Sequence, residues 1–201
     1  MRVIGITGPS GAGKGLCCNC FVSNGIPWID TDNVYHQLID SPSACVRELS
    51  AAFGSGILDA NGAVDRKALA AVVFSELDHQ KLELLNHITH KYVRDETVRL
   101  LRNYETHGEK AVVVDAPLLF EAKFDELCDF CIAVIAPHHI RLKRIMVRDN
   151  LSEDRAKARL AAQKTDEYYV SRSKYTITND SDEQNVETQI SYILETEGLI
   201  G

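Results

Sequence analysis

A glycine-rich segment near the amino terminus constrains the fold of this 201-residue sequence more than any other feature. The segment Gly8–Gly15 reads Gly-Pro-Ser-Gly-Ala-Gly-Lys-Gly, follows the apolar run Val-Ile-Gly-Ile, and precedes a stretch typical of a helix. This order predicts a strand, a tight loop and a helix. Glycines let loop amides point inward at a polyphosphate, and a helix start offers unpaired N–H groups to the same anion. The segment therefore predicts a phosphate-binding loop.

The individual loop residues indicate how a nucleotide would be held. We expect Lys14 to supply a mobile positive charge to the terminal phosphates. The expected nucleotide contacts are Gly8, Ser10, Gly11, Ala12, Gly13, Lys14, Gly15 and Leu16. Most such loops continue with a Ser or Thr whose hydroxyl binds Mg²⁺, whereas this chain has Gly15. Loops of the adenylate kinase kind also carry Gly-Lys-Gly. Glycine at position 15 therefore weakens the prediction of a metal ligand more than the prediction of phosphate binding. A glycine-rich turn without a ligand is the alternative.

Composition bounds the class of protein. The chain is 45% hydrophobic, which suits one core with a small insertion beside it. It lacks an apolar run of the roughly 20 residues that cross a bilayer, and its start does not resemble a signal peptide, so we expect a cytosolic protein. The net charge of −7 argues against general affinity for nucleic acid or membranes.

The six cysteines are expected to be reduced and buried. Three of them crowd one predicted helix between residues 17 and 20, and the pair Cys128-x-x-Cys131 has no second pair at a suitable spacing. A zinc site built from cysteines is therefore not expected.

Carboxylates stand at the ends of two predicted strands. The run from Ile26 to Asp32 reads as a short strand. Asp32 could cap a helix starting at Asn33, act as a functional group, or do both. The unbroken β-branched run 111–115 predicts a buried parallel strand that ends in Asp115, which we expect to stand near Mg²⁺, through water.

Alternating strand and helix patterns predict an α/β fold with a five-stranded, doubly wound parallel sheet. Further strands are expected at 130–135 and 175–179. Helices are expected at 44–53, at 66–74 with Asp65 as the cap, at 78–107 and at 184–196.

A basic region interrupts this acidic chain between residues 141 and 174, with ten Lys or Arg against five Asp or Glu. Arg141, Arg144 and Arg148 share one face of a predicted helix. Ser152 is expected to cap a second helix with a stripe of Arg155, Arg159 and Gln163. Two arginine-bearing helices next to a phosphate site favour a lid that closes over phosphates, the alternative being a solvated helix face.

These segments together resemble the dephospho-CoA kinase family over nearly the full length of the chain. The matching motifs are Gly5–Lys14, Ile29–Asp32, Val64–Leu69 with Val73-Phe74, the His90 segment, Asp115–Glu121, Arg148-Asp149, Gln163 and Asn179-Asp180. The Pro-Leu-Leu-Phe-Glu run within Asp115–Glu121 discriminates best among P-loop kinases. The chain departs from the family at Gly15, at Lys91 in place of a proline, and at Ser181 in place of a glycine.

The resemblance implies transfer of the ATP γ-phosphoryl group to the ribose 3′-hydroxyl of dephospho-CoA with Mg²⁺, the last step of coenzyme A synthesis. It implies a nucleotide core (1–40, 108–136 and 168–201), a helical region receiving the CoA precursor (41–107) and a lid (137–167). The implied catalytic residues are Asp32, Lys14, Arg144 and Arg148. The implied substrate contacts are Asp32, Arg66, His90, Pro117, Leu118 and Leu119, with Arg148 and Asn179 at the nucleotide.

Two other functions remain open on the sequence. A nucleoside monophosphate kinase would share the Gly-Lys-Gly loop and the lid. A regulatory protein that binds a nucleotide without turnover would suit the missing hydroxyl at Gly15, although strand-end carboxylates and an arginine lid would then be idle.

Overall fold

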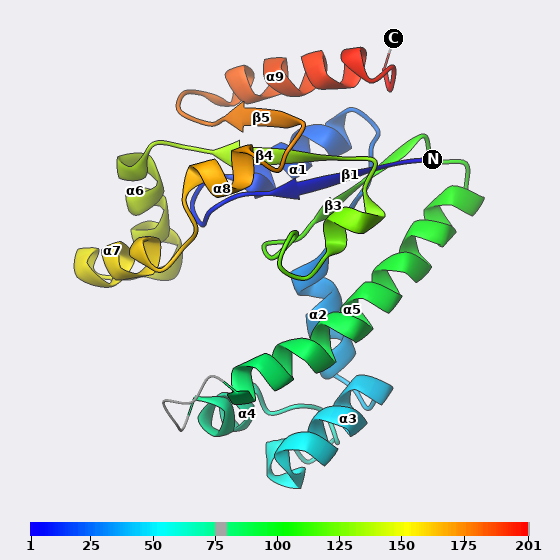
Figure 1. The fold of residues 1–201 in the computed structure, drawn as a ribbon, viewed down its shortest axis with the longest axis vertical. Helices are drawn as coiled ribbons and strands as arrows, with labels where there is room; N and C mark the ends of the chain where they lie inside the picture. The colour runs from blue at the N-terminus through cyan, green and yellow to red at the C-terminus, as the bar shows by residue number, and fades with distance from the viewer. Residues whose placement is uncertain (75–79, 201) are drawn as a thin grey trace. The chain divides into compact units, whose positions relative to one another are not determined.

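A five-stranded parallel sheet organises the computed structural model, which describes residues 1–74 and 80–200 (Figure 1). The strands are β1 (Arg2–Thr7), β2 (Trp28–Asp30), β3 (Ala111–Asp115), β4 (Phe130–Ile135) and β5 (Tyr175–Thr178), in the spatial order β2-β3-β1-β4-β5. Central β1 pairs with β3 through Ile4 and Val113, and with β4 through Gly5 and Cys131. The predicted fold class is thus confirmed.

Helices connect the strands. They are α1 (Lys14–Ser23), α2 (Thr31–Ile39), α3 (Ala44–Phe53), α4 (Arg66–Val73), α5 (Gln80–Thr106), α6 (His138–Asp149), α7 (Glu153–Ala161), α8 (Asp166–Val170) and α9 (Glu183–Thr196), with short 3-10 helices η1 (Ser55–Ile57) and η2 (Phe124–Leu127). None of the helices within residues 1–74 and 80–200 is long and apolar enough to cross a membrane.

Several predicted boundaries are confirmed and others need correction. The strands at 111–115 and 130–135 and the helix at 44–53 lie where predicted, and Asp65 caps α4. The long helix was expected from residue 78, and residues 78 and 79 lie outside the described part. Gln163 lies beyond the end of α7, and the Ser152 hydroxyl accepts no capping N–H from the described residues.

The prediction that Asp32 could cap a helix starting at Asn33 is wrong. The side chain of Asp30 accepts hydrogen bonds from the backbone N–H groups of Asp32 and Asn33, at 2.9 and 3.2 Å. The helix α2 therefore begins at Thr31, and Asp32 lies exposed in its first turn. Asp30 fits the cap because its backbone is still extended, as β2 leaves it.

The chain divides into two compact units. One comprises Met1–Ile29 and Asn103–Gly201, and the other comprises Asp30–Arg102. In the first unit, strand residues such as Ile4 and Ile132 are buried with Phe21 of α1 and Ile190 of α9. Burial of each such side chain contributes about 1.5–3 kcal/mol. This unit carries the glycine loop and the predicted lid.

The second unit has a core of its own, built between α2, α3, α4 and α5. Its fully buried side chains include Ile39, Leu49 and Ile57. Arg66 at the start of α4 donates to both carboxylate oxygens of Asp40 at the end of α2, at 2.7 and 3.0 Å. This ion pair joins the end of α2 to the start of α4.

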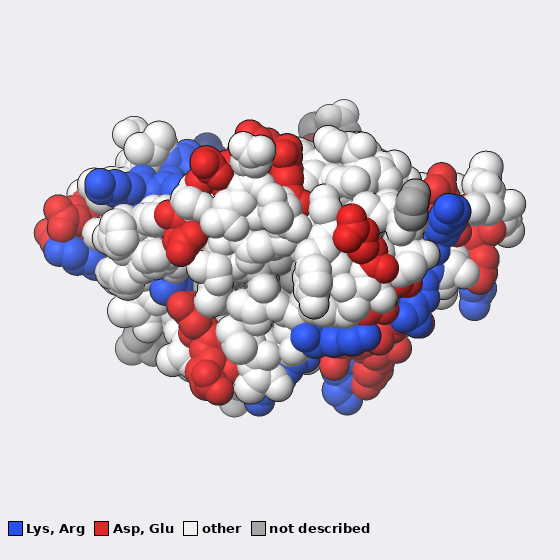
Figure 2. All heavy atoms as spheres, turned by 90° about the horizontal axis from the view of Figure 1, so that it is seen from above, with Lys and Arg blue, Asp and Glu red and all other residues white. Residues whose placement is uncertain are grey.

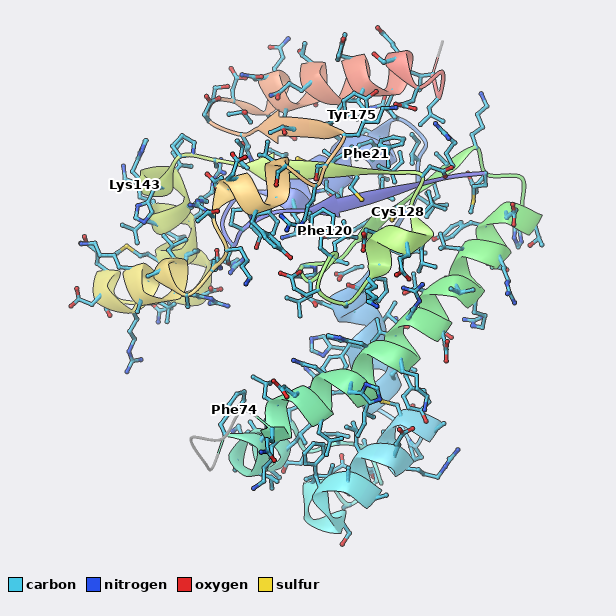
Figure 3. All side chains as sticks on the ribbon, viewed as in Figure 1. Phe21, Phe74, Phe120, Cys128, Lys143 and Tyr175 are labelled. Atoms are coloured by element: carbon cyan, nitrogen blue, oxygen red, sulfur yellow. The ribbon has the colours of Figure 1, made fainter. Side chains whose placement is uncertain are left out.

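A buried carboxylate anchors the end of α9 to the sheet of the first unit. Glu197 accepts hydrogen bonds from Lys174 and Tyr175, each at 2.5 Å, and from Arg2 at 2.9 Å (Tyr175 is labelled in Figure 3). These donors, Lys174 first, lower the pKa of Glu197 to about 2. A depressed pKa means that the stabilisation is present above the unfolded-state value and is lost as the pH falls toward the folded-state value.

We expect Glu197→Gln to lower the free energy of unfolding by about 1–3 kcal/mol at neutral pH, because it removes a charged acceptor from three donors. The difference from the parent should shrink between about pH 4.5 and pH 2, where the parent carboxylate gains its proton. Urea unfolding at pH 7 and pH 3 measures both values, with Glu195→Gln as an exposed control on the same helix. An equal loss at the two pH values would contradict the assignment.

Candidate active site

The glycine loop between β1 and α1 has a backbone that only glycine adopts easily. Gly8, Gly11 and Gly13 have φ values of 147°, 80° and 99°. A Cβ on Gly8 would lie 2.1 Å from the Val134 carbonyl oxygen, and one on Gly13 would lie 2.0 Å from Nδ2 of Asn179. The loop therefore needs glycine for both its conformation and its close contacts.

Lys14, the first residue of α1, lies folded back over the loop. Its Nζ donates to the Gly8 carbonyl oxygen at 3.2 Å, and within the described residues it has no carboxylate partner. The helix start beside it has Gly13 as its N-cap, without a side chain to occupy the first amides. An ammonium group and free amides next to one loop form a site for a polyphosphate.

Asn179 and Arg144 hold the glycine loop by hydrogen bonds to its carbonyl oxygens. Asn179 is buried, and its Nδ2 donates to the Ala12 carbonyl oxygen at 2.9 Å. Arg144 donates to the carbonyl oxygens of Gly11 and Ala12 at 3.3 and 3.2 Å, and to Oδ1 of Asn179 at 3.0 Å. Loop amides that point at phosphate turn neighbouring carbonyls the other way, and these carbonyls need donors of their own.

These hydrogen bonds change the interpretation of two predicted residues. The family resemblance implied that Arg144 is catalytic and that Asn179 contacts the nucleotide. Both side chains are instead engaged with the loop carbonyls and with each other. In this structure Arg144 donates to the carbonyl oxygens of the glycine loop. A glycine-rich loop whose amides face a ligand leaves carbonyl oxygens that need donors, and this signal was present in the sequence. Only the fold shows that Arg144 and Asn179 supply these donors.

Arg148 lies at the rim of the loop. Its Nη2 donates to the Ser10 hydroxyl at 3.2 Å, and Asp149 accepts from both Nε and Nη2 of Arg148 at 2.8 Å. Arg159 of α7 donates to the same carboxylate at 2.5 Å. The hydrogen bond from Arg148 is the main cause that lowers the pKa of Asp149. One carboxylate thus orients two exposed arginines beside the phosphate loop.

Two other residues of the predicted lid have partners in the first unit, to which the lid itself belongs. Oε1 of Gln163 accepts from the Ser10 backbone N–H at 3.0 Å, so the segment after α7 touches the loop directly. Arg141, although predicted on the same helix face as Arg148, pairs with Asp166 of α8 at 3.3 Å. The sequence did not indicate α8, which is only five residues long.

The predicted metal residue Asp115 ends β3 next to Ile6 of β1. Its Oδ2 lies 3.9 Å from the Cys18 sulfur of α1. A Cβ on Gly15 would meet no atom within 4 Å, so open space remains where related loops place a hydroxyl. Mg²⁺ prefers oxygen ligands and retains several waters. A strand-end carboxylate beside the loop, with open space at Gly15, fits an ion held mainly through water.

The three predicted substrate contacts in the segment after Asp115 differ in their exposure to solvent. Leu118 is exposed and Pro117 is half-buried, so both are accessible. Leu119 is fully buried, and its Cδ2 lies 3.1 Å from the place of a Cβ on Gly5. Contrary to the prediction, the Leu119 side chain belongs to the core under β1, because a fully buried side chain presents no surface to a substrate.

The remaining predicted site residues belong to the second unit. Asp32 is exposed in the first turn of α2, and Arg66 is held by Asp40. His90 on α5 is half-buried, and burial, followed by the nearby charge of His87, lowers its pKa. Lys91, a departure from the family pattern, forms an ion pair with Glu48 at 2.9 Å.

The site and the sheet together define the P-loop kinase class. The site combines the glycine loop, the lysine at the helix start and the arginines at the rim of the loop. A shikimate kinase of Bacteroides thetaiotaomicron shares the fold with a TM-score of 0.53 at 14% identity, over 98% of both chains. Within this class the chain belongs to the dephospho-CoA kinase family, because the family model matches residues 2–185. It is thus a member of an enzyme family of phosphotransferases.

Individual relatives agree with this assignment. The chain is 35% identical to a dephospho-CoA kinase of Bacillus thuringiensis over 198 residues, which covers 98% of each sequence. It is 34% identical to one of Arabidopsis thaliana over 194 residues, covering 96% of this chain and 83% of the plant protein. A Thermus thermophilus protein of known crystal structure superposes with a TM-score of 0.83 at 29% identity, over 100% of this chain and 98% of the other.

Proposed function

We propose that this protein transfers the γ-phosphoryl group of ATP to the ribose 3′-hydroxyl of dephospho-CoA, which yields coenzyme A and ADP. The observation that carries the proposal is the family match through residues 2–185, which includes both structural units. The glycine loop alone would suit any P-loop kinase. A match that also includes the helical unit favours the acceptor of this family.

The contacts of the first unit support separate roles for its residues in phosphoryl transfer. Catalysis of this reaction depends mainly on positioning the reactants and neutralising their charge. We assign Lys14 and the loop amides to the β- and γ-phosphates. Arg148, with its guanidinium oriented by Asp149, is assigned to the transferring group. Arg144 and Asn179 hold the loop carbonyls, which keeps the amides directed at the nucleotide. Mg²⁺, when bound through Asp115 and waters, would neutralise phosphate charge.

The helical unit is proposed to receive the acceptor, with Arg66 and His90 among its contacts. Pro117 and Leu118 remain proposed substrate contacts. We retain residues 41–107 for the acceptor region and residues 137–167 for the lid. The contacts of Arg148 and Gln163 with Ser10 support a lid that touches the phosphate loop.

Asp32 is proposed as the base that orients and deprotonates the 3′-hydroxyl. We expect Asp32→Asn to lower kcat by about 10²-fold, the lower range for loss of a general base, with an unchanged melting temperature. Asp30→Asn is the matched control, because it removes the same charge two residues away and keeps a side chain that caps α2. If kcat of Asp32→Asn stays within a few-fold of the parent while Asp30→Asn loses activity, the base has been assigned to the wrong carboxylate.

The acceptor is tested by offering the purified protein ATP and Mg²⁺ with one acceptor at a time. Dephospho-CoA should be phosphorylated with turnover, whereas AMP, GMP, CMP and UMP should not. Turnover with a nucleoside monophosphate and none with dephospho-CoA would identify a nucleoside monophosphate kinase. ATP binding without transfer to any acceptor would identify a regulatory nucleotide-binding protein.

A further inference from the structure

Three potential metal ligands from distant parts of the sequence meet between α1 and α9. They are Cys20 of α1 and Glu183 and Glu187 of α9. The Cys20 sulfur and one carboxylate oxygen from each glutamate all lie within 4.8 Å of one another. Both helices belong to the first unit and pack together in its core through residues such as Phe21 and Ile190. The positions of the three ligands are therefore fixed by one packed helix pair.

The cysteine provides an observation independent of the acidic pair. Cys20 is only 4% exposed, and within residues 1–74 and 80–200 its sulfur has no hydrogen bond or ion pair with another side chain. Its thiol is a buried polar group directed at two carboxylates. Burial, followed by the charges of Glu187 and Glu183, raises the pKa of Cys20. A bound cation would reverse this electrostatic effect, because a metal-bound thiol loses its proton.

No salt bridge is seen for either glutamate among residues 1–74 and 80–200. Glu183 and Glu187 are separated by four residues on one helix, a spacing at which like charges destabilise. Within the described residues neither forms an ion pair with a Lys or Arg. Figure 2, which views the molecule from above Figure 1, shows several acidic side chains on the face where α9 lies. The place between α1 and α9 thus combines a thiol with two carboxylates that have no Lys or Arg partner within the described residues.

We infer that Cys20, Glu183 and Glu187 form a binding site for a zinc-like divalent cation, distinct from the phosphate loop. A thiolate favours zinc over magnesium or calcium, and carboxylates are accepted zinc ligands. Zinc–sulfur and zinc–oxygen bonds of about 2.0–2.3 Å place tetrahedral ligands about 3.3–3.8 Å apart. The exposed glutamates can reach this spacing by changing rotamer, and water would complete the coordination.

The spacing of the cysteines in the sequence does not reveal this site. The sequence shows three cysteines crowded on one helix and a separate Cys128-x-x-Cys131 pair, and neither arrangement has the spacing of a zinc site. The ligands from α9 lie more than 160 residues farther along the chain. Only the packing of α9 on α1 brings the carboxylates to Cys20.

The test is titration of Zn²⁺ into the full-length protein after metal has been removed with a chelator. We expect one Zn²⁺ per chain and a melting temperature that rises with Zn²⁺ concentration, since the ion binds the folded state. Glu187→Gln should weaken binding at least about tenfold, a change at the low end of those seen when metal-site partners are altered. Glu195→Gln, an exposed glutamate on the same helix, should leave the affinity unchanged.

Two further variants distinguish this site from the other cysteines. Cd²⁺ should produce a thiolate-to-metal charge-transfer band that disappears in Cys20→Ser and persists in Cys128→Ser. If Cys20→Ser does not fold, the double variant Glu183→Gln/Glu187→Gln decides, because both of its positions are exposed. Absence of saturable Zn²⁺ binding, binding that survives this double variant, or loss of the band only in Cys128→Ser would overturn the inference.

Discussion

We expect Lys14→Met to lower kcat for dephospho-CoA phosphorylation by about 10³-fold, because charge stabilisation of the transferring group is the main catalytic term available to a phosphotransferase. The Lys14 ammonium donates to the Gly8 carbonyl oxygen, so it already lies at the loop that would receive the phosphates. Met retains the aliphatic length of the side chain and removes its charge. The melting temperature should therefore change little while the rate collapses. Steady-state kinetics with saturating ATP measures the effect.

Lys143→Met is the matched control for this variant. Lys143 is exposed on α6 and points away from the sheet (Figure 3). The same chemical change there should leave kcat within about twofold, since isolated surface charges contribute little. If Lys14→Met retained a near-normal rate, the loop would not be the site of the transferring phosphate.

We expect Arg148→Ala to lower kcat by about 10³-fold, in the range found for arginines supplied to a phosphoryl transition state. Asp149 holds two nitrogens of Arg148 at 2.8 Å, and this arrangement orients the guanidinium before substrate arrives. The KM for ATP should change less than kcat, because the contribution is made mainly in the transition state. Initial rates over a range of ATP concentrations separate the two parameters.

The control for Arg148 is Arg155→Ala, which removes an equal charge from α7 of the same lid. Arg155 is exposed, and no contact with the loop is seen in the described part of the chain. Its loss should change kcat by no more than a few-fold. A comparable fall in both variants would mean that the overall charge of the lid matters and that the position of Arg148 does not.

The sequence predicted the sheet well, because parallel strands buried on both faces leave unbroken apolar runs such as residues 111–115. Local signals also located Asp65 as a cap and the helix at 44–53. The sequence did not decide which residue caps α2. Asp30 and Asp32 both lie at the start of this helix, and local patterns do not say which carboxylate accepts hydrogen bonds from the backbone amides. The backbone at Asp30 settles this point.

The candidate site was predictable where one short segment carries the chemistry, as in Gly8–Gly15. It was less predictable where distant segments meet. The contacts of Arg144 and Asn179 with Ala12 join residues more than 130 positions apart, so helix periodicity identified an arginine face without indicating its partner. Leu119 was misassigned for a similar reason, since burial depends on the tertiary packing of β1 against its segment.

The position of the transferred phosphate tests the central claim most directly. The protein is incubated with γ-labelled ATP, Mg²⁺ and dephospho-CoA, and the product is analysed by phosphorus NMR and by its label. The account predicts stoichiometric transfer of label into a phosphomonoester at the ribose 3′ position, together with ADP. Label released as inorganic phosphate, or found on any other hydroxyl, would contradict it.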